Sequence, residues 1–380
     1  MKTLYLHIGM ARSGTTSIQS FCANNQEELN RNGYCYPIMP FSYAKANKNR
    51  NAHFMYGWVK EKNKERNIEK ENQFREQGFS QLYEAFKTYD NVILSDEGLW
   101  NCGFRGDNNV WARLRIEMKE HHFRTKVVVY LRRQDEYLFS WWGQRIKEGL
   151  YAQKTLTWEQ MLTDLPVVQL DYYQVLEDIA FYVGRENIIV RRFGKQYFTN
   201  ASLYEDFLTA VNLTYSDAYH INKEVLNAGL SYNNIEIKRI LNQIPDMTTE
   251  EEAAFRNILV KNSSIHQPKF NYSMYSEEEA EAFYNKYRGQ NQKVAFKYLG
   301  IDTDLFEFQY TAEKKWTREN EEMLEDMLFF MTQESISLRR EIQTANAQLK
   351  QQQKELDSLK RLLRHPLKTI GKKLMKKSDS

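Results

Sequence analysis

The sequence has little cysteine, little proline and no long apolar run. Its 380 residues include 3 cysteines and 6 prolines. Cys22, Cys35 and Cys102 are too few and too scattered for a disulfide framework or a zinc site. No apolar stretch is long enough for a signal peptide or a membrane span. These absences lead us to expect a cytoplasmic protein whose cysteines are small apolar core residues.

An excess of charge of one sign is also missing from most of the chain. Lys and Arg number 53 against 50 Asp and Glu, a formal net charge of +3, so the chain as a whole lacks the basic excess typical of nucleic-acid-binding proteins. The exception is the C-terminal end, where eight basic residues from Lys360 onward stand against one acidic residue, Asp379. What remains is a globular composition, with 42% hydrophobic and 27% charged residues, sufficient for one large core or two modest ones.

Short apolar runs rich in β-branched residues alternate with segments of helical periodicity, which indicates parallel strands covered by helices. The predicted strands are residues 4–8, 34–36, 91–95, 126–131 and 187–190, and the helices between them lie near 15–30, 68–89, 135–148 and 171–183. Further amphipathic helices, near 203–211, 231–243, 249–260 and 276–299, predict a helical cap. We therefore expect an α/β domain with a helical cap, and a polar, solvated excursion at 45–75.

The composition shifts again from about residue 316, toward Glu, Gln, Lys and Leu with no Gly or Pro before Pro366. Heptad positions are filled by Ile342, Leu349, Leu356 and Leu363, and the companion positions by Leu338, Ala345, Gln352 and Leu359. This pattern predicts a coiled-coil helix over residues 316–365 that joins copies of the chain. One long surface helix folded back on the domain is the alternative.

Residues 366–380 form a basic tail in which Leu367, Ile370 and Leu374 share one helical face. Such a segment predicts an amphipathic helix on an anionic membrane surface, here the inner face of the membrane. A disordered basic tail is the alternative. Nucleic acid is a poorer candidate partner because no aromatic residues alternate with these lysines.

The most informative motif follows the first predicted strand and reads Gly9-Met10-Ala11-Arg12-Ser13-Gly14-Thr15-Thr16-Ser17. Glycines at this spacing let backbone amides close around a phosphate, and the start of the following helix adds partial positive charge. The glycines match the G-x-x-x-x-G-K-[ST] loop of nucleotide hydrolases, but Thr15 stands where that motif requires lysine. Arg12 supplies the cation instead.

This segment resembles the 5′-phosphosulfate loop of the sulfotransferases that use 3′-phosphoadenosine 5′-phosphosulfate (PAPS). Those enzymes carry a second element for the 3′-phosphate, in which a strand leads to Arg and, eight residues later, to Ser at the start of a helix. Here the strand KVVVYL leads to Arg132, and Ser140 follows at that spacing. A forked guanidinium and a hydroxyl on one phosphate would select a nucleotide with a 3′-phosphate over ATP.

The resemblance covers residues 1–310 loosely and implies a P-loop-type fold. It implies that Ser13, Gly14, Thr15, Thr16 and Ser17 bind the 5′-phosphosulfate together with Arg12, and that Arg132 and Ser140 bind the 3′-phosphate. No metal is implied. Many members carry Lys where this chain has Arg12, and arginine keeps the charge but cannot give up a proton. We therefore expect Arg12 to act by electrostatic stabilisation.

The activity implied is transfer of a sulfuryl group from PAPS to a hydroxyl, or less often an amine, with release of adenosine 3′,5′-bisphosphate (PAP). The expected acceptor is a cell-surface carbohydrate or its lipid-linked precursor. A base must take the acceptor proton, and two candidates stay open. Glu97 lies just past the strand VILSD, at the carboxyl edge of the predicted sheet, and His53 lies in the polar excursion.

Two other classes remain open. In a nucleotide kinase or ATPase, Asp96 at the end of VILSD would bind magnesium, although the loop lacks its lysine. In a non-catalytic scaffold, the heptads and the basic tail would be the functional parts. His7, inside the first strand, is predicted to be a packed core residue, and the other histidines show no metal-ligand spacing.

Overall fold

The chain was analysed as a computed structural model, which describes residues 1–44, 46–61, 65–105, 108–149, 152–163, 169–221 and 229–364. Its centre is one five-stranded sheet with all neighbours parallel, in the order β2-β3-β1-β6-β7. The strands are β1 (Thr3–His7), β2 (Tyr34–Cys35), β3 (Asn91–Ser95), β6 (Arg124–Leu131) and β7 (Ile188–Arg192). The predicted α/β class and the five predicted strands are confirmed.

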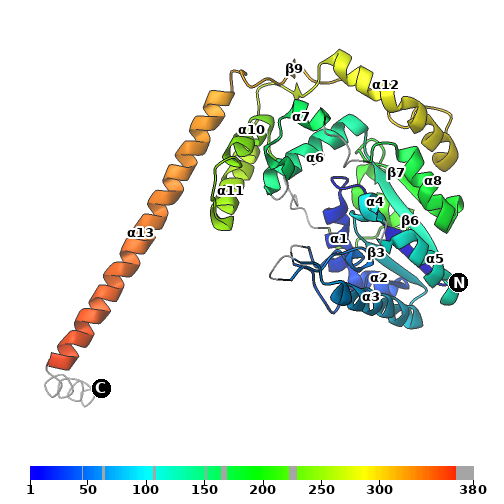
Figure 1. Cartoon of the computed structure of the whole chain (residues 1–380), viewed down its shortest axis with the longest axis horizontal. Coiled ribbons are helices and arrows are strands. Elements are labelled where there is room, and N and C mark those ends of the chain that lie inside the picture. Colours follow the sequence, from blue (N-terminus) through cyan, green and yellow to red (C-terminus); the bar gives the residue numbers. More distant parts are fainter. Residues whose placement is uncertain are drawn as a thin grey trace.

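Helices cover both faces of the sheet (Figure 1). One face packs against α1 (Thr15–Asn24), α2 (Gln26–Arg31) and α9 (Leu203–Ala210), and the other against α3 (Ile68–Thr88), α5 (Val110–Glu120), α6 (Gln134–Glu148) and α8 (Tyr172–Val183). Successive side chains of β1 alternate between the two cores, with Leu4 and Leu6 in one and Tyr5 in the other. Strands buried on both faces read as continuous apolar runs, which is why the sequence revealed them.

Shorter elements and a helical cap complete the body. They are α4 (Leu99–Cys102), β4 (Phe104–Arg105), β5 (Asn108–Asn109), α7 (Trp158–Thr163), α10 (Tyr232–Leu241), α11 (Thr249–Ile265), β8 (Tyr272–Ser273), α12 (Glu277–Val294) and β9 (Lys314–Lys315). Two cap helices begin with reciprocal capping boxes, made by Thr248 with Glu251 and by Ser276 with Glu279. These satisfy amides that the first helical turn leaves without partners.

The last helix, α13 (Met323–Arg364), begins later than the predicted residue 316 and projects away from the body (Figure 1). The delay has a local cause, because Lys314–Lys315 pairs with β8 and the buried Glu322 accepts hydrogen bonds from Tyr272 Oη and Lys269 N. The predicted amphipathic tail, 366–380, lies outside the described residues. Among the helices described, none combines the length and apolar character needed to cross a bilayer.

The excursion predicted to be solvated is partly buried. The Asn51 side chain accepts a hydrogen bond from Ser95 N and donates to the carbonyl oxygens of Pro37 and Ile93. Phe54 then packs edge-on against Phe79 of α3. The prediction was wrong here because the contacts of Asn51 and Phe54 hold a 3₁₀ turn, η1 (His53–Met55), against the end of β3 and against α3. The polar residues around these two side chains concealed this packing in the sequence.

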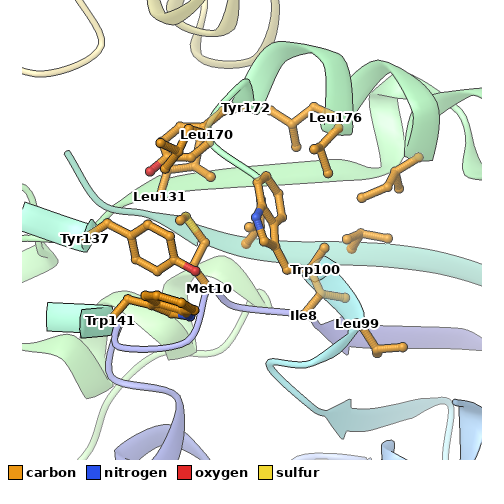
Figure 2. Close-up of a cluster of buried hydrophobic side chains, with 14 of the residues drawn as sticks. Ile8, Met10, Leu99, Trp100, Leu131, Tyr137, Trp141, Leu170, Tyr172 and Leu176 are labelled. Carbon is orange, nitrogen blue, oxygen red and sulfur yellow. The ribbon is translucent and has the colours of Figure 1, made fainter. Parts of the chain in front are cut away.

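A compact apolar cluster lies beneath the carboxyl edge of the sheet. Figure 2 shows Met10 of the loop after β1 close to Tyr137 and Trp141 of α6, with Trp100 nearby. Met10 is completely buried, so it anchors the first loop against α6. This apolar cluster packs beneath the loops that follow the strands and supports them.

Candidate functional site

Three loops meet at the carboxyl edge because their strands are neighbours in the sheet. β1 lies between β3 and β6, so the segment after β1 is flanked by Asp96 to Gly98 and by Arg132 to Arg133. Open α/β sheets bind ligands at this edge, near the strand where the order reverses. Every site residue predicted from the sequence lies in these loops, in the helices that follow them or in η1.

The loop after β1 is held by two left-handed residues and an internal bond. Arg12 has φ 69° and Gly14 has φ 76°, a region that is uncommon for a residue with a Cβ. A Cβ on Gly14 would also lie 2.5 Å from Leu203 Cδ2, so glycine avoids both the backbone strain and this close contact. Ser13 is buried, and its hydroxyl donates to the Met10 carbonyl oxygen at 2.6 Å. Ser13 therefore shapes the loop with its side chain turned inward.

The loop opens into α1, whose first residues are Thr15, Thr16 and Ser17. Gly14, at the N-cap, has no side chain with which to cap the helix, so the amides of the first turn are left for a ligand or water. Thr16 and Ser17 are partly exposed, whereas Thr15 is buried. The start of α1 therefore presents amides, hydroxyls and the positive end of the helix dipole.

Arg12 links the two elements that the sequence placed more than a hundred residues apart. Its Nε donates to Ser140 Oγ at 2.9 Å and its Nη1 to Gln144 Oε1 at 2.9 Å. Arg132 Nη1 in turn donates to the Arg12 carbonyl oxygen at 3.3 Å. The fold thus brings Arg12, Ser140 and Arg132 into one contact network, and it adds Gln144, which the sequence analysis missed.

Two cations share this part of the site. Burial lowers the pKa of Arg12, and the charge of Arg132 lowers it further, with Glu148 acting in the opposite direction. Arg132 also lies over the ring of Phe193, 5.6 Å from its centroid. Two neighbouring guanidinium groups repel each other, and a bound dianion would relieve that repulsion.

A cavity of about 200 Å³ adjoins Arg132. Its lining includes Phe193, Gly194, Tyr197 and Phe306. Aromatic walls beside a guanidinium suit a flat, apolar ring attached to an anionic group.

Asp96, just past β3, is the centre of a second network and is fully buried. Its carboxylate accepts hydrogen bonds from Arg50 Nε (3.0 Å) and Nη2 (2.7 Å), Tyr56 Oη (2.7 Å), the Gly98 amide (2.7 Å) and His53 Nδ1 (3.0 Å). Burial alone would raise the pKa of Asp96, but the charge of Arg50 and the contact with His53 hold it well below its usual range. Asp96 is therefore ionised in the folded protein.

This network determines which tautomer the neutral His53 side chain adopts. An ionised carboxylate only accepts hydrogen bonds, so the neutral imidazole must carry its proton on Nδ1, which leaves the lone pair on Nε2. The rings of Tyr43 and Tyr56 pack edge-on to His53, with centroids 4.6 and 4.9 Å away. The His53 side chain keeps 17% of its surface exposed, so it is oriented yet reachable.

Glu97 lies next to Asp96 but has different partners. Its Oε2 accepts from Gln19 Nε2 of α1 at 2.9 Å, and Arg50 Nη1 lies 3.5 Å from its Oε1. Glu97 thus contacts α1 through Gln19 and forms an ion pair with Arg50.

Asp96 does not resemble a magnesium ligand in this arrangement. Its oxygens are already engaged by Arg50, Tyr56 and His53, and a cation would have to displace the guanidinium. Elsewhere in the described chain, Glu117, Glu120 and His121 bring potential ligand atoms within 4.8 Å of one another. Glu117 there accepts from Tyr83 Oη and Arg113 Nε, which gives this carboxylate structural partners.

His7 is buried beneath the first loop, as predicted for a core residue. Its Nδ1 lies 2.9 Å from Ser95 Oγ, and its Nε2 has no partner among the described atoms. Burial lowers the pKa of His7 to about 3, against a smaller opposing effect of Asp96. The unfolded chain therefore binds a proton at His7 at a higher pH than the folded chain does.

We predict that His7 makes the protein sensitive to mild acid. The contribution of neutral His7 to the free energy of unfolding is complete above its pKa in the unfolded chain, about 6.5. This contribution is lost as the pH falls toward the pKa of His7 in the folded protein, because the unfolded state then takes up more protons. From pH 7.5 to pH 5, His7 should cost about 2 kcal/mol of unfolding free energy. Urea denaturation at the two pH values should show His7→Phe losing that much less than wild type; equal losses would contradict the prediction.

Comparisons with known proteins leave the family open. No protein-family profile matches this chain. The chain is 24% identical over 229 residues to an uncharacterized protein of Archaeoglobus fulgidus, a match that covers 57% of this chain and 61% of that relative. The chain thus spans less than two thirds of that relative's length. It is also similar to the crystal structure of a sulfotransferase from Alicyclobacillus acidocaldarius, with 13% identity, a TM-score of 0.36 and coverage of 70% of this chain and 97% of that one. Evidence for a function therefore comes from the contacts of the site.

Proposed function

We propose that this protein is a PAPS-dependent sulfotransferase. One observation carries the proposal: the Arg12 guanidinium donates to Ser140 at 2.9 Å while Arg132 donates to the Arg12 backbone at 3.3 Å. The two elements that resemble the 5′-phosphosulfate and 3′-phosphate sites therefore adjoin each other. A nucleotide with phosphates at both positions matches two neighbouring cationic elements better than ATP, whose phosphates form one chain.

Each element has a distinct task in this proposal. The start of α1 and Arg12 bind the 5′-phosphosulfate, Arg132 and Ser140 bind the 3′-phosphate, and the aromatic cavity at Phe193 accepts the adenine. The helix dipole and the guanidinium both favour the negative charge that grows on the 5′-phosphate oxygen as the sulfuryl group departs.

We further propose that His53 is the base. Nε2 takes the proton of the acceptor hydroxyl as its oxygen bonds to sulfur, and the bond from sulfur to the 5′-phosphate oxygen breaks, releasing PAP. Asp96 holds the imidazole in the required tautomer and stabilises the imidazolium that forms. Glu97, paired with Arg50 and Gln19, positions the start of α1 against this network.

The proposed acceptor is a hydroxyl-bearing carbohydrate or its lipid-linked precursor. The support is the set of side chains near His53, where Phe41 and Tyr43 supply aromatic surface and Asn47 and Lys48 supply polar groups around a cavity of only about 20 Å³. The contacts of Asp96 weigh against the magnesium-dependent kinase or ATPase, because Arg50 holds the carboxylate that the metal would need.

Thermal unfolding with PAP, with AMP and with ATP plus magnesium tests the nucleotide assignment. A ligand at 100 times its dissociation constant adds about 2.7 kcal/mol, or roughly 4 °C in melting temperature for a domain of about 300 residues. We expect the largest rise with PAP. A rise only with ATP and magnesium would contradict the proposal.

Replacing Arg132 with alanine should weaken the binding of PAP about 10- to 100-fold, because a charge-assisted contact to the 3′-phosphate is lost. The affinity for AMP, which has no 3′-phosphate, should stay nearly unchanged. The titration of melting temperature against each nucleotide measures both affinities. Arg185→Ala is the matched control, since Arg185 precedes β7 at the opposite edge of the sheet and pairs with Glu177. Equal losses for PAP and AMP would remove the 3′-phosphate assignment.

A further inference from the structure

The strongest unassigned surface of the molecule is the exposed apolar stripe along α13. The first turns of α13 pack on the body, where Asp326 pairs with His266 at 2.7 Å and the ring of Phe330 contacts that of Phe255. All residues from 338 to 360 are exposed. The helix has 42 residues, about 63 Å at 1.5 Å per residue, so most of its length stands free of the body (Figure 1).

The exposed apolar side chains of α13 follow one heptad register. With Ile342 at position a, positions a and d hold most of them, each between 46% and 66% exposed: Leu324, Leu328, Met331, Leu338, Ile342, Leu349, Leu356 and Leu359. The body contacts use other positions, since Met323 and Phe330 fall at c and Asp326 at f. The face used by the body and the apolar seam are therefore different faces of the same helix.

A single helix with such a seam is not stable by itself in water. Helical stability in proteins comes mainly from packing an amphipathic face, and a strict a/d stripe is the narrow seam of a coiled coil. A partner helix is therefore required to cover the stripe. The charges beside the seam identify that partner and its direction.

Beyond the turns that pack on the body, the charged g positions are Glu334, Glu341 and Glu355, and the charged e positions are Arg339 and Lys360. In a parallel pair of helices, each g residue faces the e residue five positions later on the other copy. Glu334 then faces Arg339 and Glu355 faces Lys360. In an antiparallel pair g faces g and e faces e, which sets glutamate against glutamate and arginine against lysine. The flanking charges thus favour a parallel pairing of identical helices.

We propose that α13 joins two copies of this chain as a parallel two-stranded coiled coil. Ser335 at a and Gln352 at d form polar layers that pair with themselves only in this alignment, and polar core layers set register at a cost in stability. The proposal does not depend on the proposed function, because it uses no residue of the candidate site.

Sedimentation equilibrium of the full chain tests the association. Wild type should have twice the mass of one chain at micromolar concentration. The double variant Leu349→Asp/Leu356→Asp should raise the dissociation constant about 100-fold or more, because it buries charge in the seam. The control Gln343→Asp/Gln351→Asp adds the same two charges at outer positions and should remain dimeric. A monomeric wild type, or a seam variant that stays dimeric, would overturn the proposal.

Single cysteines at the polar layers test the direction. Ser335→Cys and Gln352→Cys should each form an intermolecular disulfide under mild oxidation, seen on a non-reducing gel, because equivalent positions face each other along a parallel pair. Wild type, which retains its own three cysteines, gives the background. An antiparallel pair can bring at most one of these positions opposite itself, so cross-linking of only one variant, or of neither, would overturn the parallel arrangement.

Discussion

Replacement of His53 with alanine is expected to lower PAPS turnover by about 10²- to 10⁴-fold while the affinity for PAP stays close to that of wild type. The imidazole is the group that Asp96 orients, and its Nε2 carries the free lone pair of the network. Removing it leaves the proposed nucleotide-binding elements at Arg12 and Arg132 intact. The release of PAP from PAPS, with a hydroxyl-bearing saccharide or water as acceptor, measures the rate even while the natural acceptor is unidentified.

Glu97→Gln is the matched comparison for His53→Ala. The amide can keep its contact with Gln19 but has no carboxylate to accept a proton, so a modest loss is expected if His53 is the base. A large loss in Glu97→Gln together with nearly normal turnover in His53→Ala would transfer the role of base to Glu97. Melting temperatures of both variants show whether a lower rate has a trivial cause in unfolding.

Replacement of Arg12 with alanine is expected to reduce turnover by about 10³-fold or more, the loss seen when a positioned cation that stabilises a developing oxyanion is removed. The loss in affinity for PAPS should be much smaller, because the charge on the 5′-phosphate oxygen grows from the bound donor toward the transition state and the contact strengthens with it. Arg12→Lys should recover part of the rate, since lysine keeps the charge but not the forked geometry that reaches Ser140 and Gln144.

Ser140→Ala serves as the control for Arg12, because it removes one contact of the guanidinium and leaves its charge in place. We expect Ser140→Ala to affect PAP affinity more than the rate of transfer. If Arg12→Ala instead lowered the affinity for PAPS and kcat/KM by the same factor, Arg12 would contribute uniform binding and its role in charge stabilisation would be wrong.

The sequence by itself determined the sheet and drew attention to the two candidate phosphate-binding elements. Parallel strands are buried on both faces, so runs such as KVVVYL are apolar throughout and stand out from their surroundings. The segment from Gly9 to Ser17 is a local pattern, because its residues all lie on one loop and the start of the helix after it. The pair Arg132 and Ser140 is also local, because both residues lie within one loop and the helix that follows. Such local patterns can be recognised in a sequence before the fold is known.

The tertiary structure alone decided which side chains share a network. The sequence placed His53 in a solvated excursion and offered Asp96 only as the magnesium ligand of a rival kinase or ATPase, yet the fold buries Asp96 and surrounds it with Arg50, Tyr56 and His53. A buried carboxylate must find donors, but the sequence does not say which ones, because they come from a segment some forty residues earlier that Asn51 fastens to β3. Side-chain partners across such separations are set by packing, which has no local pattern to be read.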